Sequence, residues 1–247
     1  METTYIEIDS PDKHLSDVLE EIPSNVILYK TLTGIGATYS EIKAQRHSII
    51  IEPNVPVIIG KCNSDKHKND NLLGVYEGVT TDRIIKYLGA SRGKYYKILT
   101  TPESFTKVKD AFLIFNGKIY NTCFLLIDEA HKTIKDVDYR SDIVLPMNDF
   151  FKFKGKALVS ATPLKFSDPR FEENGFSIIK IEPTYDYAKE IDIKPSTNIL
   201  REVWEEFGWM PFITGQDKDR PFFIFINSVG IISVSYTHLR AHETRSN

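Results

Sequence analysis

The chain has 247 residues, of which 41% are hydrophobic, 26% charged and 12% aromatic, and its formal net charge is −3. This is the composition of a globular protein, long enough for one large domain or for one domain and part of another. The charge excludes a strongly basic protein, although a local groove can bind a phosphate backbone while the rest of the surface is acidic.

The cysteines and the N-terminal stretch indicate a cytoplasmic protein. Cys62 and Cys123 belong to no Cys-x-x-Cys or Cys/His pattern with metal spacing, so we expect two free thiols. The stretch METTYIEIDSPDKHL is polar and lacks the apolar segment of a signal peptide. No run of residues approaches the ~18 apolar positions of a membrane span.

Short runs of β-branched and aromatic residues recur along the chain and predict strands. Between them, residues 80–90 and 104–115 have apolar side chains at i, i+3 and i+4 spacing, which predicts helices. Several runs are apolar without alternation, as in strands buried on both faces. Strand and helix in alternation predict an α/β domain, with a mostly parallel sheet and helices on both faces. The predicted strands are residues 25–30, 47–54, 72–78, 96–102, 122–130, 156–163, 176–183 and 220–228.

The pattern weakens near residue 184, and this sets the expected domain organisation. Residues 1–184 form the α/β domain, and residues 185–232 are interpreted as a linker and the start of a second, incomplete α/β domain. Residues 233–247 (SVSYTHLRAHETRSN) resemble the translation of a sequencing adapter, so we expect a non-native tail. His238 and His242 have the spacing of half a zinc site, but they fall in this tail and are set aside.

Residues 31–40 (TLTGIGATYS) directly follow an apolar run and look like a phosphate-binding loop. Such a loop works because successive backbone N–H groups converge on an anion, and glycines let the backbone approach it closely. Gly34 and Gly36 are the close-approach positions, and Thr38 would offer its hydroxyl to magnesium. Taken alone, the pattern is a weak signal, because Gly-x-Gly-x-Thr turns are common between strands and helices, and an ordinary turn of that kind is the alternative.

An acidic pair ends another predicted strand. In FLLIDEAHK, Asp128 and Glu129 come at the carboxyl end of the strand, which is the ligand-binding edge of a parallel sheet. An aspartate there can hold magnesium, and a glutamate beside it can orient or deprotonate a water molecule. The alternative is a solvated acidic turn that opens a helix.

A third motif, LVSATP, ends a further apolar run. The hydroxyls of Ser160 and Thr162 would lie at the same edge of the sheet, where they can bond the acidic pair or His131. The alternative is a turn in which these hydroxyls cap the strand.

The order and spacing of the three motifs resemble the first motor domain of superfamily 2 helicases of the DEAD/DEAH-box type, which has a RecA-like P-loop NTPase fold. The acidic strand follows the glycine loop by about 90 residues, and Ser-Ala-Thr follows about 30 residues later. IIIEPNVPVI (49–58) and ILTTPESF (98–105) resemble motifs Ia and Ib of the family. FFIFINSV (222–229) resembles motif IV, and the likeness covers roughly residues 22–230.

The resemblance implies ATP and magnesium as cofactors and a role for each matching residue. Glu129 would be the catalytic base, and Asp128 with Thr38 would hold magnesium. The residues implied around the phosphates are Thr33, Gly34, Ile35, Gly36, Ala37 and Thr38. Those implied in coupling the site to domain movement are His131, Ser160, Ala161 and Thr162. Those implied in contacts to a nucleic-acid backbone are Pro53, Asn54, Thr101, Pro102 and Glu103.

Members of that family contact mainly phosphates and sugars, which is compatible with a chain that is not strongly basic. The basic stretches 61–68 and 91–97 would add electrostatic attraction, with Tyr95 and Tyr96 as stacking groups. The alternative is that both stretches are solvated loops.

One position departs from the family's loop. Where that loop contains Gly-Lys-Thr, this chain has Ala37 in place of the lysine that neutralises the β- and γ-phosphates. Lys30 or Lys43 could supply the charge, but Lys43 lies five residues past Thr38 and Lys30 must turn back around the loop. Otherwise the site binds nucleotide and hydrolyses it slowly, or the domain is an inactive motor used for binding.

The leading hypothesis is an ATP-dependent helicase or translocase, present here as its first motor domain with the start of the second. The family's arginine fingers lie late in the second domain, so we expect little ATPase activity and no unwinding from these 247 residues alone. One alternative is a nucleic-acid-binding or scaffold protein that keeps the motor fold, and another is the motor subunit of a restriction system. The expected partner is nucleic acid, DNA before RNA, and no membrane.

Overall fold

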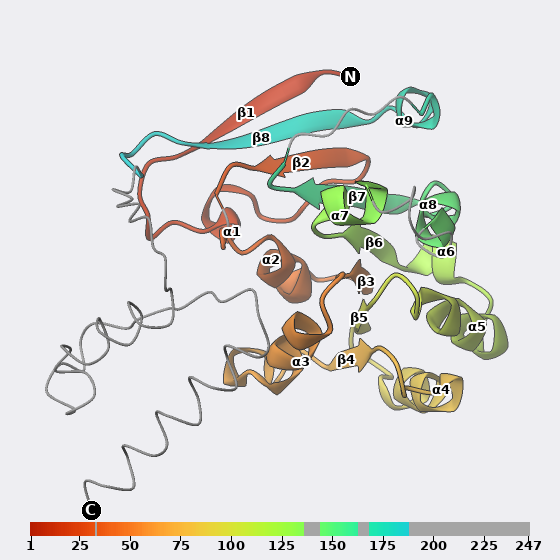
Figure 1. Ribbon diagram of the computed structural model, residues 1–247. Helices are drawn as coiled ribbons and strands as arrows, with labels where there is room; N and C mark the ends of the chain where they lie inside the picture. The colour runs from red at the N-terminus through yellow and green to blue at the C-terminus, as the bar shows by residue number, and fades with distance from the viewer. Residues whose placement is uncertain (33, 136–143, 163–167, 188–247) are drawn as a thin grey trace, which may run out of the picture. The chain divides into compact units, whose positions relative to one another are not determined.

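The computed structural model describes residues 1–32, 34–135, 144–162 and 168–187, and its α/β architecture confirms the predicted fold class (Figure 1). The described strands form one eight-stranded sheet in the order β1-β8-β2-β7-β6-β3-β5-β4. Each pair of neighbouring strands is parallel. The strands are β1 (Thr3–Ile8), β2 (Val26–Lys30), β3 (Ser48–Ile51), β4 (Leu72–Val75), β5 (Lys97–Thr100), β6 (Phe124–Ile127), β7 (Gly155–Ser160) and β8 (Ser177–Pro183).

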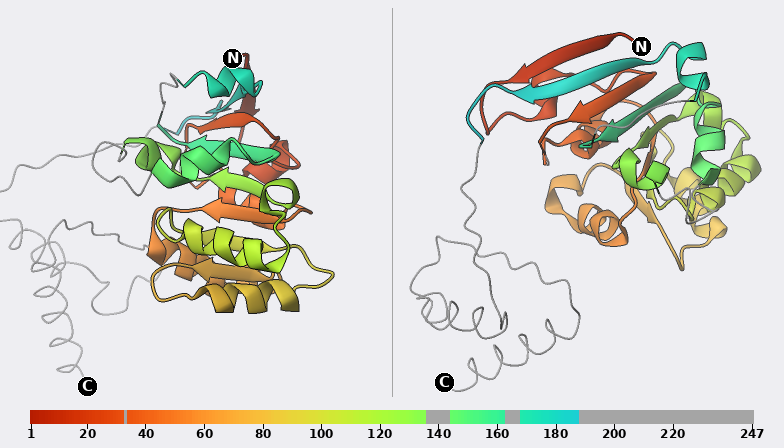
Figure 2. Two further views of the ribbon diagram at one scale, coloured as in Figure 1. Left: turned by 90° about the vertical axis from the view of Figure 1, so that its right-hand side faces the viewer. Right: turned by 45° about the horizontal axis from the view of Figure 1, so that its top comes forward.

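Helices connect the strands and lie on both faces of the sheet (Figure 2), as parallel crossovers require. The described helices are α1 (Leu15–Val18), α2 (Ala37–Lys43), α3 (Val55–Asn63), α4 (Thr81–Ala90), α5 (Phe105–Phe115), α6 (Ile119–Thr122), α7 (Ala130–Lys135), α8 (Val144–Phe150), α9 (Arg170–Glu173) and the 3₁₀ turn η1 (Asp65–His67). None of them is long and apolar enough to cross a membrane.

Each face of the sheet carries its own apolar core. Successive residues of a strand point to opposite faces, so Ile27 packs with the side chains of α4 and α5, whereas Leu28 packs with those of α2 and α3. Ile49 and Ile50 divide between the two clusters in the same way, and all four side chains are fully buried. This double burial explains why the central strands are continuous apolar runs rather than alternating ones.

Seven of the predicted strands are present as β2 to β8, and the helices predicted at 80–90 and 104–115 are present as α4 and α5. β1 was not predicted, because its sequence TTYIEI has few apolar residues and most of its side chains are exposed at the edge of the sheet. The strand predicted at 220–228 lies outside the described residues.

The predicted domain division stays a prediction. β8 ends at Pro183, next to the expected boundary, but nearly all of 185–232 and the whole of 233–247 fall outside the described residues, as do the two tail histidines. Both cysteines are described, and each is a free thiol as expected.

Candidate functional site

The glycine turn and the acidic pair lie at the same rim of the sheet, as the motif analysis expected. β7 is the one strand between β2 and β6, and all three run parallel, so their carboxyl ends open onto one edge. A hydrogen bond from the Thr38 hydroxyl to Asp128 Oδ2 joins the two segments directly. Residues 90 positions apart in the sequence therefore form one site.

The glycine turn depends on backbone angles that favour glycine. Gly34 has φ 81° and Gly36 has φ 87°, both in the left-handed region, and Gly36 is the residue that caps the start of α2. The N–H of Leu15 donates to the carbonyl oxygen of Ile35 at 2.8 Å, which anchors the turn to α1. Thr33 lies outside the described residues.

Asp128 is 4% exposed, and its carboxylate receives hydrogen bonds on both oxygens. Oδ1 accepts from Lys30 Nζ at 3.0 Å and from the backbone N–H of Glu129 at 2.8 Å. Oδ2 accepts from the Thr38 hydroxyl. A buried carboxylate needs such partners, because desolvation without them is costly. The aspartate is therefore held in one orientation before any ligand arrives.

Glu129 has a φ of 51°, in the left-handed region that a residue with a side chain seldom adopts. Its Oε1 lies 2.8 Å from Lys30 Nζ, and its Oε2 lies 3.6 Å from His131 Nδ1. The unusual backbone turns the glutamate back toward the end of β2, so that both members of the acidic pair contact one ammonium group.

Lys30, the last residue of β2, is the cation that contacts both Asp128 and Glu129, and it is 8% exposed. Burial disfavours its charged form, but the carboxylates of Asp128 and Glu129 outweigh that effect and raise the pKa of Lys30 above its ordinary value. The ammonium is therefore charged at neutral pH.

Ser160 and His131 meet beside the acidic pair, and the Ser160 hydroxyl also caps the turn after β7, which was the alternative for the third motif. The Ser160 hydroxyl donates to the carbonyl oxygen of Thr162 at 2.7 Å and accepts from the Thr162 N–H at 3.1 Å. His131 Nδ1 lies 3.2 Å from the same hydroxyl oxygen. Because that hydroxyl has one proton and already donates it, His131 Nδ1 must carry the hydrogen of this contact. The half-buried Ala161 lies in the turn between Ser160 and Thr162.

A cavity of about 320 Å³ opens at this rim. Its lining combines the glycine turn and the acidic pair with residues from α3 and α7. That volume is at the lower end of the range for small-molecule sites, which suits a compact polar group. The described lining residues are Lys30, Gly34, Ile35, Gly36, Ala37, Thr38, Tyr39, Glu52, Asn54, Val57, Lys61, Asp128, Glu129 and Lys132.

Glu52 is a lining residue that sequence reasoning did not select. It follows β3 directly, is 3% exposed, and accepts a hydrogen bond from the N–H of Asn54 at 3.3 Å. Burial, together with the charge of Asp128, raises the pKa of Glu52 to about 7. Its position one residue past a buried strand, at the same rim as Asp128, was the available signal.

The oxygen atoms of this site suit a magnesium ion that takes only part of its coordination from the protein. No group of three or more His, Cys, Asp or Glu side chains suited to a metal occurs among the described residues. Magnesium usually takes one or two protein oxygens and completes its octahedron with water and phosphate oxygens. Asp128 and Thr38 would hold it here, and it would neutralise phosphate charge.

The five residues predicted to contact nucleic acid follow β3 and β5 at the same carboxyl rim. Glu103 is exposed, and Pro53 and Asn54 are half-buried. Thr101 and Pro102 are buried, and the Thr101 hydroxyl accepts from the N–H of Ser104 at 3.3 Å, which stabilises the turn before α5. A nucleic-acid role for these residues stays a prediction.

The two tyrosines of the basic stretch differ in exposure. Tyr95 is 46% exposed, whereas Tyr96 is half-buried with its ring stacked on His47 at a centroid distance of 4.2 Å. The N–H of Tyr96 also donates to His47 Nδ1 at 2.9 Å. Tyr96 is therefore engaged inside the domain, and the exposed ring is that of Tyr95.

No protein-family profile and no curated protein matches this sequence. Three of the solved structures that this chain resembles are helicases. A hypothetical ATP-dependent RNA helicase from Sulfolobus tokodaii is 16% identical, with 64% of this chain and 48% of that one covered and a TM-score of 0.44. The Pyrococcus furiosus Hef helicase domain is 14% identical, with coverages of 91% and 51% and a TM-score of 0.44.

The DUF1998 helicase MrfA is 11% identical, with 90% of this chain and 36% of MrfA covered, and its TM-score is 0.51. This likeness shows a shared α/β fold of the helicase type, and the identity is too low to carry function. The chain spans about half the length of the first two structures and about a third of MrfA.

Proposed function

We propose that this chain binds ATP and magnesium at the rim formed by β2 and β6. The observation that carries the proposal is the meeting of four side chains from three separate segments. Thr38 bonds Asp128, while Lys30 Nζ lies 3.0 Å from Asp128 and 2.8 Å from Glu129. A hydroxyl, a cation and two carboxylates beside a glycine turn are the groups that a triphosphate and its metal require.

Each residue has a distinct role in this proposal. The turn containing Gly34 and Gly36 receives the phosphates, since a Cβ at Gly34 would meet nothing within 4 Å and the backbone there is open. Asp128 and Thr38 hold magnesium, and Glu129 orients and deprotonates the attacking water. His131 contacts Ser160 and so couples ligand binding at the acidic pair to the position of the loop after β7.

We further propose that the domain belongs to an ATP-dependent helicase or translocase of superfamily 2, of the DEAD/DEAH-box type. The motifs, together with the helicase MrfA among the structural neighbours, support a nucleic acid as the partner, and we propose DNA before RNA. A motor of this class needs a second α/β domain, so a protein with both domains would carry the activity. A restriction-system motor would use the same site.

The second candidate is a nucleic-acid-binding module with little hydrolysis, and Ala37 favours it. Position 37 is 3% exposed and its methyl group packs in the apolar cluster on the α2 face. The loop itself therefore offers no cation to the phosphates. Binding would persist in such a protein while turnover would be slow.

Equilibrium binding tests the shared core of both candidates. A fluorescent ATP analogue is titrated with the full chain, with and without magnesium, by anisotropy. We expect magnesium to tighten binding, and Asp128→Asn to remove that gain at a cost of roughly 10- to 100-fold. Asp168→Asn is the control, because Asp168 pairs with Arg170 outside the cavity lining. Absence of binding at millimolar analogue, with the chain folded, would contradict the proposal.

A further inference from the structure

Lys30 is a buried cation in the lining of the rim cavity, whose glycine turn has Ala37 where the related loop has lysine. Among the described lysines, the cavity lining contains Lys30, Lys61 and Lys132. Lys132 is exposed, and Lys61 is half-buried, with its charge acting on Glu52. Lys30 is the buried one, and it contacts both carboxylates of the acidic pair.

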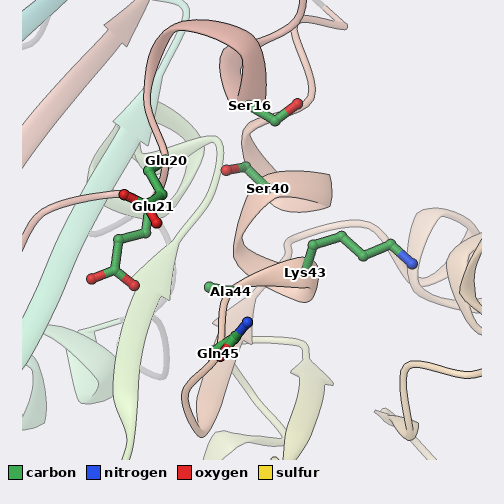
Figure 3. Close-up of a pocket in the computed structure, with 7 residues that line it drawn as sticks. All are labelled: Ser16, Glu20, Glu21, Ser40, Lys43, Ala44 and Gln45. Carbon is green, nitrogen blue, oxygen red and sulfur yellow. The ribbon is translucent and has the colours of Figure 1, made fainter.

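Lys43, the other candidate from the loop region, is engaged elsewhere. Its Nζ lies 2.6 Å from Asp70 Oδ2 and 2.8 Å from Oδ1, and it donates to the carbonyl oxygen of Lys66 at 3.1 Å. It lines a separate hollow of about 420 Å³, together with residues of α1 and of the segment after α1 (Figure 3). In that view its side chain leads away from Glu20 and Glu21. Lys43 is therefore not available to the rim cavity.

The geometry of Lys30 suits a phosphate contact. It ends β2, the strand that enters the glycine turn, and it lines the same cavity as Gly34 and Gly36. An ammonium has three N–H donors, and the two carboxylates account for two of them. One donor therefore remains for an acceptor in the cavity.

We propose that Lys30, supplied by the strand before the loop, makes the cationic contact to the phosphates that Ala37 cannot make. This inference rests on the proposed function and deepens it. It identifies the ligand class as a nucleoside di- or triphosphate, because a nucleoside without phosphates has no anionic oxygen for the Lys30 ammonium to contact. It also makes the alanine in the loop compatible with tight nucleotide binding, since the cation enters from β2 instead of α2.

The test compares Lys30→Met with Lys43→Met, which removes an equal charge outside the cavity. Dissociation constants for fluorescent ATP, ADP and adenosine analogues are measured with the full chain and magnesium. Losing one charge-assisted contact should weaken ATP binding by roughly 10- to 100-fold. Binding of the adenosine analogue should not change, and Lys43→Met should match the natural chain throughout.

Restoring the loop lysine makes the test two-sided. Ala37→Lys in the Lys30→Met background should recover most of the lost ATP affinity, whereas Ala37→Lys alone should gain less than roughly threefold, since the cation is already present. Unchanged ATP affinity in folded Lys30→Met overturns the inference and leaves nucleotide binding standing. If Lys30→Met does not fold, Ala37→Lys alone decides, and a gain above roughly tenfold overturns the inference. Failure of the natural chain to bind ATP overturns the proposed function itself.

Discussion

The Thr38 hydroxyl donates a hydrogen bond to Oδ2 of Asp128, and both residues are nearly inaccessible to solvent, at 6% and 4% exposure. The contact joins the first turn of α2 to the end of β6. It also satisfies the carboxylate oxygen that neither Lys30 nor the backbone of Glu129 reaches. The Thr38 hydroxyl therefore completes the hydrogen bonding of the buried Asp128 carboxylate and connects the glycine turn to the acidic pair.

Thr38→Val tests this contact, because valine keeps the shape of threonine and removes the hydroxyl. We expect the free energy of unfolding to fall by about 1–3 kcal/mol, the cost of an unmet hydrogen bond to a buried charged group. Magnesium-dependent binding of a fluorescent ATP analogue should weaken in the same variant. Thr38→Ser, which keeps the hydroxyl, should retain both properties within about 1 kcal/mol. Equal behaviour of the two variants in urea unfolding and in binding would show that the hydroxyl is not the important group.

A second buried charge stabilises the sheet away from the site. Glu41 has no exposed surface, and Arg46 reaches it with Nη2 at 2.6 Å from Oε2 and Nε at 3.0 Å from Oε1. The guanidinium also lies over the ring of Phe124 at 3.5 Å. The Ser48 hydroxyl donates to Glu41 Oε1 at 2.6 Å. The pair links α2 to the strands on which the site is built.

Arg46→Ala should therefore destabilise the domain strongly, since it leaves a buried carboxylate without its cation. The expected loss in the free energy of unfolding is about 3–5 kcal/mol by urea titration. Adding Glu41→Gln to Arg46→Ala should recover part of the lost free energy of unfolding, because the unpaired carboxylate charge is then removed. Lys13→Ala, which breaks an exposed pair with Asp9, is the control and should change stability by less than about 1 kcal/mol. A loss below about 1 kcal/mol for Arg46→Ala would mean that solvent or the neighbouring Lys97 ammonium compensates the charge of Glu41.

Replacement of glycine by alanine should have opposite effects on stability at two positions, Gly155 and Gly89. A Cβ at Gly155 in β7 would lie 2.9 Å from a ring carbon of Phe124 and 3.2 Å from the Ser24 hydroxyl. Gly89, inside α4, would gain a Cβ with nothing within 4 Å. Gly155→Ala should destabilise by about 1–3 kcal/mol through overpacking, whereas Gly89→Ala should stabilise by about 0.5–1 kcal/mol through helix propensity. Thermal unfolding measures both, and melting shifts of the same sign would refute the packing argument.

Sequence patterns predicted the sheet well because the central strands are buried on both faces. Seven apolar runs correspond to β2–β8, and the glycine turn and acidic pair were correctly expected at one rim. β1 was not predicted because an edge strand has one partner and needs few apolar side chains. The sequence also does not show that β7 lies between β2 and β6, since strand order depends on non-local pairing.

The side-chain contacts of the site were less predictable than its position. The sequence offers Lys30 as one substitute cation, but it does not show how a side chain at the end of the preceding strand turns back around the loop. The positive φ of Glu129 turns that residue toward β2, and no pattern in the sequence indicates this angle. Glu52 was not selected because a single acidic residue after a strand is common, and its burial depends on α3 and on Asp128.

Glu52 gives the domain a specific pH dependence. Its pKa is about 7 in the folded chain, compared with an ordinary value of 4.5, chiefly because it is buried and then because Asp128 repels its charge. The folded state therefore holds this proton more tightly than the unfolded state. The resulting stabilisation is complete below about pH 4.5 and is lost as the pH rises through about 7.

Glu52→Gln should remove this dependence, because glutamine does not ionise. The variant should gain stability relative to the natural chain as the pH rises from about 4.5 to about 8, and the difference between the pKa values sets an upper limit of about 3 kcal/mol. Urea titrations across that range, in buffers without divalent cations, measure the difference. Glu77→Gln, at an exposed position, is the control and should show no such trend. A constant difference between Glu52→Gln and the natural chain across the range would show that Glu52 ionises at the same pH in both states.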